Sequence, residues 1–246
     1  MKELLRNKVL TFSAWILLSG SVIVVLLFEV INLFATPVAG IVLDHDFSEL
    51  NKFKDLALPS FNNAMADEIW RLSQGLEPIK EPEVYVLDKV PKIKKYLTNI
   101  VSDYLNRQRS YTSQFVINTS WLTRTHPKQR GQQHDHIGHC FSGVLYFDDY
   151  DNQSSNLTFY SPLKKINRFN LPTSEDNPSN WTSYKAVPSK NLLLIFPSYL
   201  DHQIEINYSD KIRYSLAFNV LPVTEYNVGD SLINIQKLAK QKNEII

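Results

Sequence analysis

The chain reads QHDHIGHCFSGVLYF over residues 133–147 and places three of its six histidines within six positions. Side chains alternate between the two faces of a strand, so His134 and His136 would point to one side and Asp135 to the other. Two imidazoles on one face can chelate a single metal ion. A polar strand end whose histidines are solvated would produce the same pattern, so this pair alone does not decide between the two interpretations.

A second segment, NLLLIFPSYLDHQIEIN (191–207), carries His202 directly after a Phe-Pro-Ser turn. Eleven residues later, Arg213 lies in the apolar run IRYSLAFNV (212–220). An arginine inside an apolar strand is costly to bury unless an anion meets it, and its planar guanidinium suits a carboxylate. Ser215 would face the same way and add a hydroxyl donor. A structural salt bridge to an acidic side chain is the alternative for Arg213.

Two close histidines, a distant third and a downstream Arg-x-Ser together form the parts of a facial triad with open iron positions. Two of the open positions would accept a bidentate 2-oxo acid, and the last would be left for dioxygen. The candidate metal ligands are therefore His134, His136 and His202.

At these residues the chain resembles the 2-oxoglutarate and iron(II)-dependent oxygenase superfamily, and within it a prolyl-hydroxylase-like branch found in phage and marine bacterial genomes. The resemblance covers roughly residues 32–223 and rests on the following motifs: His134-Asp135-His136, Ser142-Gly143-Val144-Leu145-Tyr146, Phe196-Pro197-Ser198, His202, and Arg213-Tyr214-Ser215-Leu216-Ala217-Phe218-Asn219. It implies a mainly β fold with flanking helices around a double-stranded β-helix (a jelly-roll, cupin-like core). It also implies iron(II), 2-oxoglutarate and dioxygen as cofactor and cosubstrates.

The resemblance further implies roles for single residues. His134 and His202 would bind iron, while Arg213, Ser215 and Tyr146 would bind the distal carboxylate of 2-oxoglutarate. No catalytic side chain beyond the metal centre is implied.

One position departs from the superfamily pattern, in which the second metal ligand is most often an aspartate or glutamate. His136 stands at that position here. Asp135 is next to it and stays an alternative ligand, although on a regular strand it would face away from the site.

The implied activity is that of a dioxygenase that hydroxylates a C–H bond of a peptidyl or small-molecule substrate. The alternatives are a cupin-like metalloenzyme without 2-oxoglutarate and a non-catalytic β-barrel binding module. The formal net charge of +1 predicts no attraction to nucleic acid. A single cysteine, Cys140, excludes a disulfide framework.

Periodicity predicts the elements of the rest of the chain. Apolar residues at helical spacing predict helices over residues 53–74, 92–108 and 231–242. Short β-rich runs predict strands over residues 114–121, 141–147, 156–160, 191–196, 202–206 and 212–221, and residues 32–43 form a candidate entry strand. Residues 161–188 lack a clear period and are expected to form a lid-like or substrate-facing loop.

The N-terminal region has its own character, because residues 9–28 are a run of 20 residues without a formal charge. That length can span a bilayer core, which predicts a membrane anchor and, through it, membrane association. An extension from a misplaced start and a buried hydrophobic helix are the alternatives. We therefore expect an apolar segment over residues 1–28 and the oxygenase domain over residues 29–246. The catalytic domain would be cytoplasmic, or the protein single-pass if the segment is an anchor.

Overall fold

The computed structural model describes residues 35–60, 64–165 and 171–241. The chain divides into two units, Met1–Thr36 and Pro37–Ile246, and all helices and strands of the described residues belong to the second unit. The anchor predicted over residues 9–28 lies outside the described residues, as does the domain boundary at residue 28. In the part of the chain that is described, no helix is long and apolar enough to cross a membrane.

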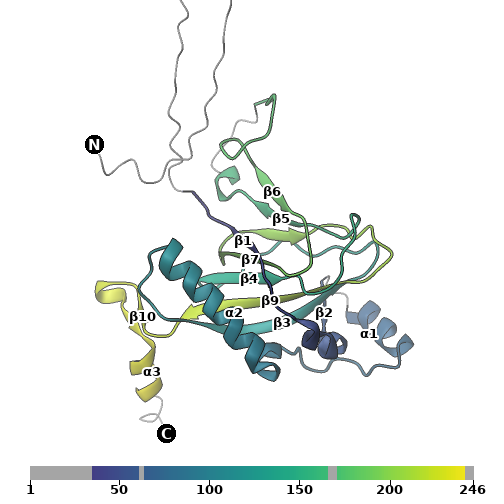
Figure 1. Cartoon of the computed structure of the whole chain (residues 1–246), viewed down its shortest axis with the longest axis horizontal. Helices are drawn as coiled ribbons and strands as arrows, with labels where there is room; N and C mark the ends of the chain where they lie inside the picture. The colour runs from purple at the N-terminus through teal and green to yellow at the C-terminus, as the bar shows by residue number, and fades with distance from the viewer. Residues whose placement is uncertain (1–34, 61–63, 166–170, 242–246) are drawn as a thin grey trace, which may run out of the picture. The chain divides into compact units, whose positions relative to one another are not determined.

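Two sheets form the body of this unit (Figure 1). The major sheet has six strands in the order β1-β7-β4-β9-β3-β2, and the minor sheet has three in the order β6-β5-β8. All pairs are antiparallel except β2 with β3. The strands of the major sheet are β1 (Ala39–Val42), β2 (Leu58–Pro59), β3 (Phe115–Thr125), β4 (Phe141–Leu145), β7 (Leu192–Pro197) and β9 (Arg213–Pro222). Those of the minor sheet are β5 (Leu157–Tyr160), β6 (Ser183–Ala186) and β8 (His202–Ile204).

The chain passes repeatedly between the two sheets after β3. It runs from β4 in the major sheet to β5 and β6 in the minor sheet, returns to β7, crosses to β8 and ends in β9. This alternation is the path of a double-stranded β-helix, so the predicted fold class is confirmed. The six predicted strand runs are all present, and β3 extends to Thr125, four residues beyond its predicted end.

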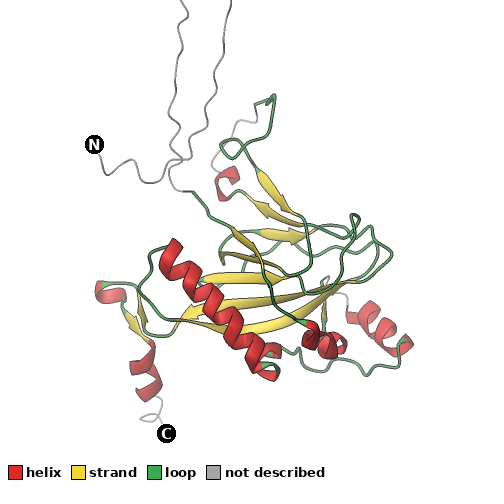
Figure 2. Ribbon diagram, in the orientation of Figure 1, coloured by secondary structure: helices red, strands yellow, loops and turns green. Residues whose placement is uncertain are grey.

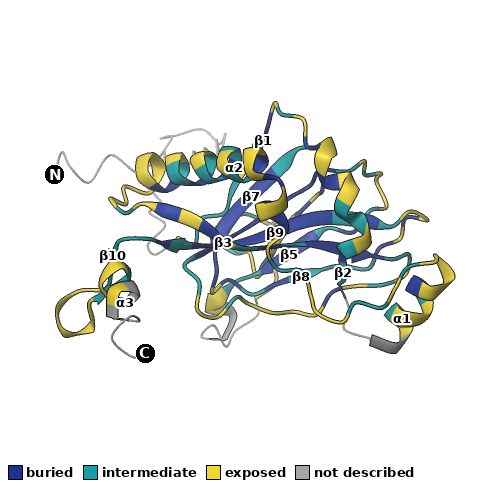
Figure 3. Ribbon diagram, turned by 90° about the horizontal axis from the view of Figure 1, so that it is seen from below, coloured by how far each residue is buried: buried dark blue, intermediate teal, exposed yellow. Residues whose placement is uncertain are grey.

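One helix covers the outer face of the major sheet. α2 (Pro91–Asp103), prolonged by a π-helical turn over Tyr104–Gln108, confirms the helix predicted over residues 92–108. Figure 1 shows it lying across the sheet, and Figure 3 shows its exposed outer side above buried strands. Its buried residues Ile93, Leu97 and Val101 pack into the larger apolar core with residues of β4, β7 and β9. A smaller core lies between the two sheets, around Phe159 and Phe196.

The helix predicted over residues 53–74 is wrong in its first half. A 3-10 helix (Ser48–Leu56) is followed by β2, and α1 occupies only Ala64–Ser73. Pro59 cannot donate a helical hydrogen bond, whereas at the edge of a sheet its missing N–H costs little. The apolar spacing within α1 also misleads, because Ile69 and Leu72 are exposed.

Two other predictions need correction (Figure 2). The segment 161–188 is not wholly a loop, because it contains β6 and a 3-10 turn over Pro162–Lys165. The four residues of β6 are too few for a period, and pairing with β5 decides their conformation. At the C-terminus, the hairpin β10 (Glu225–Tyr226) and β11 (Ile233–Asn234) precedes α3 (Ile235–Gln241), so the predicted helix begins later than residue 231.

Candidate metal centre

His134, His136 and His202 converge at one place in the fold. Their ligand atoms all lie within 4.8 Å of one another, and the ring centroids are 4.5–5.2 Å apart. Two imidazole nitrogens bound to one ion at roughly 2.1 Å can be at most roughly 4.2 Å apart, so the rings need only a small adjustment. Asp135 is exposed and is not a member of this cluster.

The two histidines of the close pair are not on a regular strand, which corrects the premise from which their common direction was predicted. His134 forms an isolated bridge with His202, with backbone N–H groups donating in both directions at 3.0 and 2.9 Å. His136 lies in the loop beyond it, and its backbone N–H donates to the carbonyl of Ser198 at 2.9 Å. The imidazoles of His134 and His136 still lie nearly parallel, with an interplanar angle of 16°.

Each imidazole is oriented through Nδ1 by an oxygen atom. The partners are the Gln132 carbonyl for His134 at 2.9 Å, the Leu200 carbonyl for His202 at 2.9 Å, and the Asn219 Oδ1 for His136 at 2.5 Å. Carbonyl and amide oxygens only accept, so in each neutral ring Nδ1 carries the hydrogen and Nε2 keeps its lone pair. A metal-binding histidine needs this tautomer and this kind of outer partner.

Burial keeps two of the three rings neutral. His202 is 3% exposed, and burial lowers its pKa to about 3. Burial also lowers the pKa of His136, against the opposing effect of its hydrogen bond with Asn219. A neutral imidazole offers its lone pair to a metal without first losing a proton, so the cluster fits a divalent ion at neutral pH.

Aromatic rings lie beside two histidines of the cluster. The rings of Phe159 and Phe196 lie 6.1 and 5.0 Å from that of His202. The ring of Trp121 on β3 lies 5.6 Å from that of His136. These rings form an apolar side of the site next to His202 and His136, whereas His134 is exposed.

Arg213 is the second feature of the interior and is 2% exposed. Its Nε donates to the Ser155 carbonyl at 3.1 Å, and its Nη1 donates to the Ser215 hydroxyl at 3.2 Å. The guanidinium carbon lies 5.0 Å from the centre of the Tyr146 ring. Among the residues that the structure describes, no carboxylate forms an ion pair with Arg213, so the salt-bridge alternative has no partner there.

Four buried polar atoms near Arg213 lack a hydrogen-bond partner among the described residues. They are Arg213 Nη2, Tyr146 Oη, Ser155 Oγ and Thr125 Oγ1. Thr125 is the register partner of Arg213 across β3 and β9, and Ser155 contacts it from the loop before β5. Buried donors without acceptors are costly, so the group fits an anion with several acceptor sites.

Sequence reasoning singled out two members of this group, Tyr146 and Arg213, together with the neighbouring Ser215, but missed Thr125 and Ser155. The register partner of Arg213 could have pointed to Thr125 once the pairing of β3 with β9 was assumed. Ser155 carries no such signal, because it lies in a polar loop with nothing to mark it.

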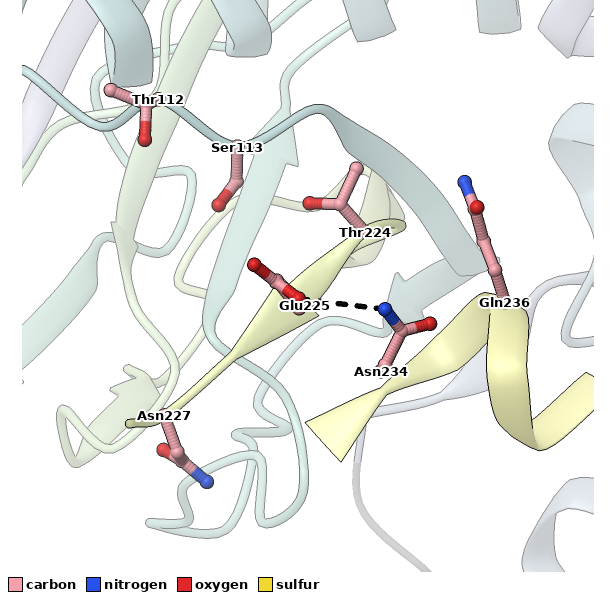
Figure 4. Close-up of a pocket in the computed structure, with 7 residues that line it drawn as sticks. All are labelled: Thr112, Ser113, Thr224, Glu225, Asn227, Asn234 and Gln236. Carbon is pink, nitrogen blue, oxygen red and sulfur yellow. Dashed lines mark hydrogen bonds between the residues drawn. The ribbon is translucent and has the colours of Figure 1, made fainter. Parts of the chain in front are cut away.

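The structure also has a polar hollow of about 410 Å³ elsewhere, shown in Figure 4. Ser113, Thr224 and Glu225 line it together with Asn234 of β11 and Gln236 of α3, and Glu225 accepts a hydrogen bond from Asn234 at 3.4 Å. None of its lining residues belongs to the histidine cluster or to the group around Arg213. This hollow is therefore separate from the candidate metal centre.

Residues 119–219 match a family model described as "Putative 2OG-Fe(II) oxygenase". The matched range contains all three histidines, Arg213 and Asn219, so the resemblance to the oxygenase superfamily is confirmed. With the three-histidine cluster, this match implies iron(II), 2-oxoglutarate and dioxygen. No curated protein matches the chain.

Several solved structures are similar. A 2OG-Fe(II) oxygenase family oxidoreductase from Burkholderia pseudomallei is 10% identical, with 51% of this chain and 56% of that chain covered and a TM-score of 0.38. A Pseudomonas putida prolyl-4-hydroxylase is 11% identical, with coverage of 75% and 92% and a TM-score of 0.44. A Trichoplax adhaerens prolyl hydroxylase in complex with a peptide fragment of hypoxia inducible factor is 17% identical, with coverage of 52% and 56% and a TM-score of 0.37. The chain thus spans little more than half of the first and third, and with TM-scores below 0.5 none of the three defines its activity.

Proposed function

We propose, from the confirmed resemblance of residues 119–219 to the 2-oxoglutarate and iron(II)-dependent oxygenases, that the protein hydroxylates a C–H bond of a peptidyl or small-molecule substrate. His134, His136 and His202 would hold iron(II), which when bound supplies the activation of dioxygen. One observation carries the proposal. The same interior holds three convergent imidazoles and a buried arginine that no acid of the described residues neutralises.

The polar group around Arg213 would bind the distal carboxylate of 2-oxoglutarate. A carboxylate offers about four lone-pair sites, and Arg213 Nη2, Tyr146 Oη, Ser155 Oγ and Thr125 Oγ1 are available as donors. Burial raises the pKa of Tyr146, so its hydroxyl keeps the hydrogen that it would donate. Ser215 supports Arg213 through the hydrogen bond to Nη1.

The alternatives account for less of this arrangement. A cupin-like metalloenzyme without an oxo acid needs the histidines but leaves Arg213 buried without an anion. A non-catalytic binding module needs neither the neutral imidazoles nor the arginine. Keeping a buried charge without a partner costs stability, which favours a role in binding.

The minor sheet supplies a feature that bears on the substrate. Tyr184 in β6, Phe159 in β5 and His202 in β8 are register partners, so their side chains share one face, directed toward the metal centre. Tyr184 is 46% exposed, and its ring lies 5.1 Å from that of Trp181, which is 41% exposed. With strands roughly 4.8 Å apart, Tyr184 lies roughly 10 Å from His202 along the sheet. This aromatic pair would contact an uncharged ring or an extended peptide that enters from the side of β6.

The cofactor test uses the full chain, iron(II) and 2-oxoglutarate without oxygen. A visible metal-to-ligand charge-transfer band is expected for the wild type, its loss for His202→Ala, and a weaker band at equal 2-oxoglutarate for Arg213→Ala. A band that is unaffected by Arg213→Ala would favour a metalloenzyme without this clamp. Folded wild-type protein that shows no band would refute the oxygenase.

The substrate test measures succinate formed with and without candidate substrates, namely proline-containing peptides and uncharged ring compounds. Tyr184→Ala and Trp181→Ala are expected to leave the slow succinate formation without substrate unchanged. Both should raise the KM of a substrate that stimulates turnover in the wild type. If neither variant changes that KM, the aromatic pair has no part in substrate binding.

A further inference from the structure

The second ligand position carries an inference that rests on the proposed metal centre. The superfamily pattern most often has a carboxylate there, whereas this chain has His136, with Asp135 beside it. The side chain that contacts His136 most closely is Asn219, whose Oδ1 lies 2.5 Å from Nδ1. Asn219 is 6% exposed and lies on β9, six residues after Arg213.

The amide of Asn219 lies in a network of polar side chains. Its Nδ2 donates to the Thr119 hydroxyl at 3.1 Å, across the register pair that joins β3 to β9. Its Oδ1 accepts from the Ser142 hydroxyl at 2.8 Å. The Ser142 oxygen also lies 2.8 Å from the Ser198 hydroxyl and 3.0 Å from Nδ1 of His136, so it is a second and more distant contact of this ring. Hydroxyls can donate or accept, but a His136 that binds metal through Nε2 carries its hydrogen on Nδ1, and this N–H requires the oxygen of Asn219.

We propose that Asn219 is the positioning residue that makes His136, and not Asp135, the second metal ligand. By accepting the Nδ1 hydrogen it selects the tautomer with a free Nε2 and directs this atom toward His134 and His202. An ionised carboxylate ligand has no hydrogen to donate, so it could not form a hydrogen bond with the Asn219 oxygen. Asp135, exposed and outside the cluster, has no such support.

The hydrogen-bond partner of His136 differs in kind from those of the other two ligands. His134 and His202 are oriented by main-chain carbonyls, which no substitution removes. Among the three ligands, only His136 is oriented by side chains, Asn219 at 2.5 Å and Ser142 at 3.0 Å. Substitution can therefore measure the contribution of an outer partner at this ligand only. Loss of such a partner typically weakens metal binding by about 10–100-fold.

The test is an optical titration of the full chain with cobalt(II), which reports both affinity and ligand geometry. Asn219→Ala is expected to weaken cobalt(II) binding by roughly 10–100-fold and to change the visible ligand-field bands. Asn219→Asp keeps an acceptor oxygen and is expected to bind at least as tightly as the wild type. Thr119→Val, which frees the amide to rotate, should give a smaller loss.

Two variants serve as controls. Asp135→Ala removes the neighbouring carboxylate, and Asn118→Ala removes a side chain whose amide nitrogen lies 3.5 Å from His139, which is not one of the proposed ligands. Both are expected to bind cobalt(II) as the wild type does. Wild-type affinity and bands in Asn219→Ala, or loss of binding in Asp135→Ala, would overturn the proposal.

Folding and the proposed function are separated in the same experiment. If Asn219→Ala does not fold, the other two variants are compared with the wild type. Asn219→Asp should preserve the ligand-field bands because it keeps the acceptor oxygen in place. Thr119→Val should change them because the amide is free to rotate. Wild-type protein that binds cobalt(II) but not 2-oxoglutarate would refute the proposed oxygenase and leave the role of Asn219 intact. Unchanged cobalt(II) binding in every Asn219 variant would refute the role of Asn219 and leave the proposed oxygenase intact.

Discussion

The two faces of the major sheet differ sharply, although the same strands build both. On β9 the residues that face α2 include Leu216, Phe218 and Val220, all fully buried in the larger apolar core. The residues between them face the minor sheet and include Ser215 and Asn219. One strand thus supplies a dry core on one side and polar groups of the candidate site on the other.

This difference shows that burial of a side chain has different consequences on the two faces of the sheet. On the outer face a buried side chain gains stability by leaving water. On the inner face Arg213, Thr125 and Tyr146 are buried with atoms that have no partner among the described residues. We therefore expect substitutions on the outer face to change stability and those on the inner face to change ligand binding.

The largest effect is expected on the outer face. Phe218→Ala should lower the free energy of unfolding by about 3–5 kcal/mol, because it empties space in a closely packed core. Urea denaturation measures the loss, and cobalt(II) affinity of the folded variant should stay as in the wild type. A large fall in metal affinity at full folding would show that the two faces are not independent.

On the inner face, Arg213→Met should lower ligand affinity without lowering stability. Loss of the guanidinium is expected to weaken 2-oxoglutarate binding by about 2–5 kcal/mol, measured by titration of the charge-transfer band. Without cosubstrate the free energy of unfolding should rise by about 1–4 kcal/mol in urea denaturation, because an unpaired buried charge is replaced by an apolar chain. A variant destabilised by as much as Phe218→Ala would show that Arg213 is structural.

Acid should destabilise the metal-free protein because His202 is buried as a neutral imidazole. His202 has a folded-state pKa of about 3, below its ordinary value of 6.5, so the unfolded chain takes up the proton first. This stability is present above pH 6.5 and is lost as the pH falls toward 3. The expected loss is about 2 kcal/mol between roughly pH 6.5 and 5, measured by urea denaturation. His202→Gln should lack this part of the pH dependence.

A substitution at Gly143 tests how closely the outer face is packed, because it adds volume there. A Cβ at this position would overlap the ring of Phe218, its register partner on β9. Gly143→Ala should therefore cost about 1–3 kcal/mol of stability by overpacking. Phe218→Leu should be less damaging in the Gly143→Ala background than alone, and purely additive losses would contradict the contact.

The smallest effect is expected from Thr125→Val, which removes one unpartnered hydroxyl beside Arg213. Affinity for 2-oxoglutarate should fall by about 1 kcal/mol, and cobalt(II) affinity should not change. Stability should stay level or rise, since a buried hydroxyl without a partner among the described residues is replaced by a methyl group of similar size. Unchanged 2-oxoglutarate affinity would remove Thr125 from the proposed clamp.

Much of this protein followed from the sequence by itself. Short β-rich runs between polar loops marked the strands, and helical spacing marked α2, because the burial of a regular element selects such residues along the chain. Residue chemistry marked His134, His136, His202 and Arg213, since few environments other than ligand sites favour such side chains beside apolar strands.

Only the tertiary structure decided the partners of those residues. Ser155 contacts Arg213 across 58 positions of sequence, and Asn219 contacts His136 across 83. No local period encodes such pairs, because they depend on the register between strands that are distant in the chain. The common direction of His134 and His136 is an instance. It was inferred from a regular strand, but a bridge to His202 and contacts with Ser198 and Asn219 produce it.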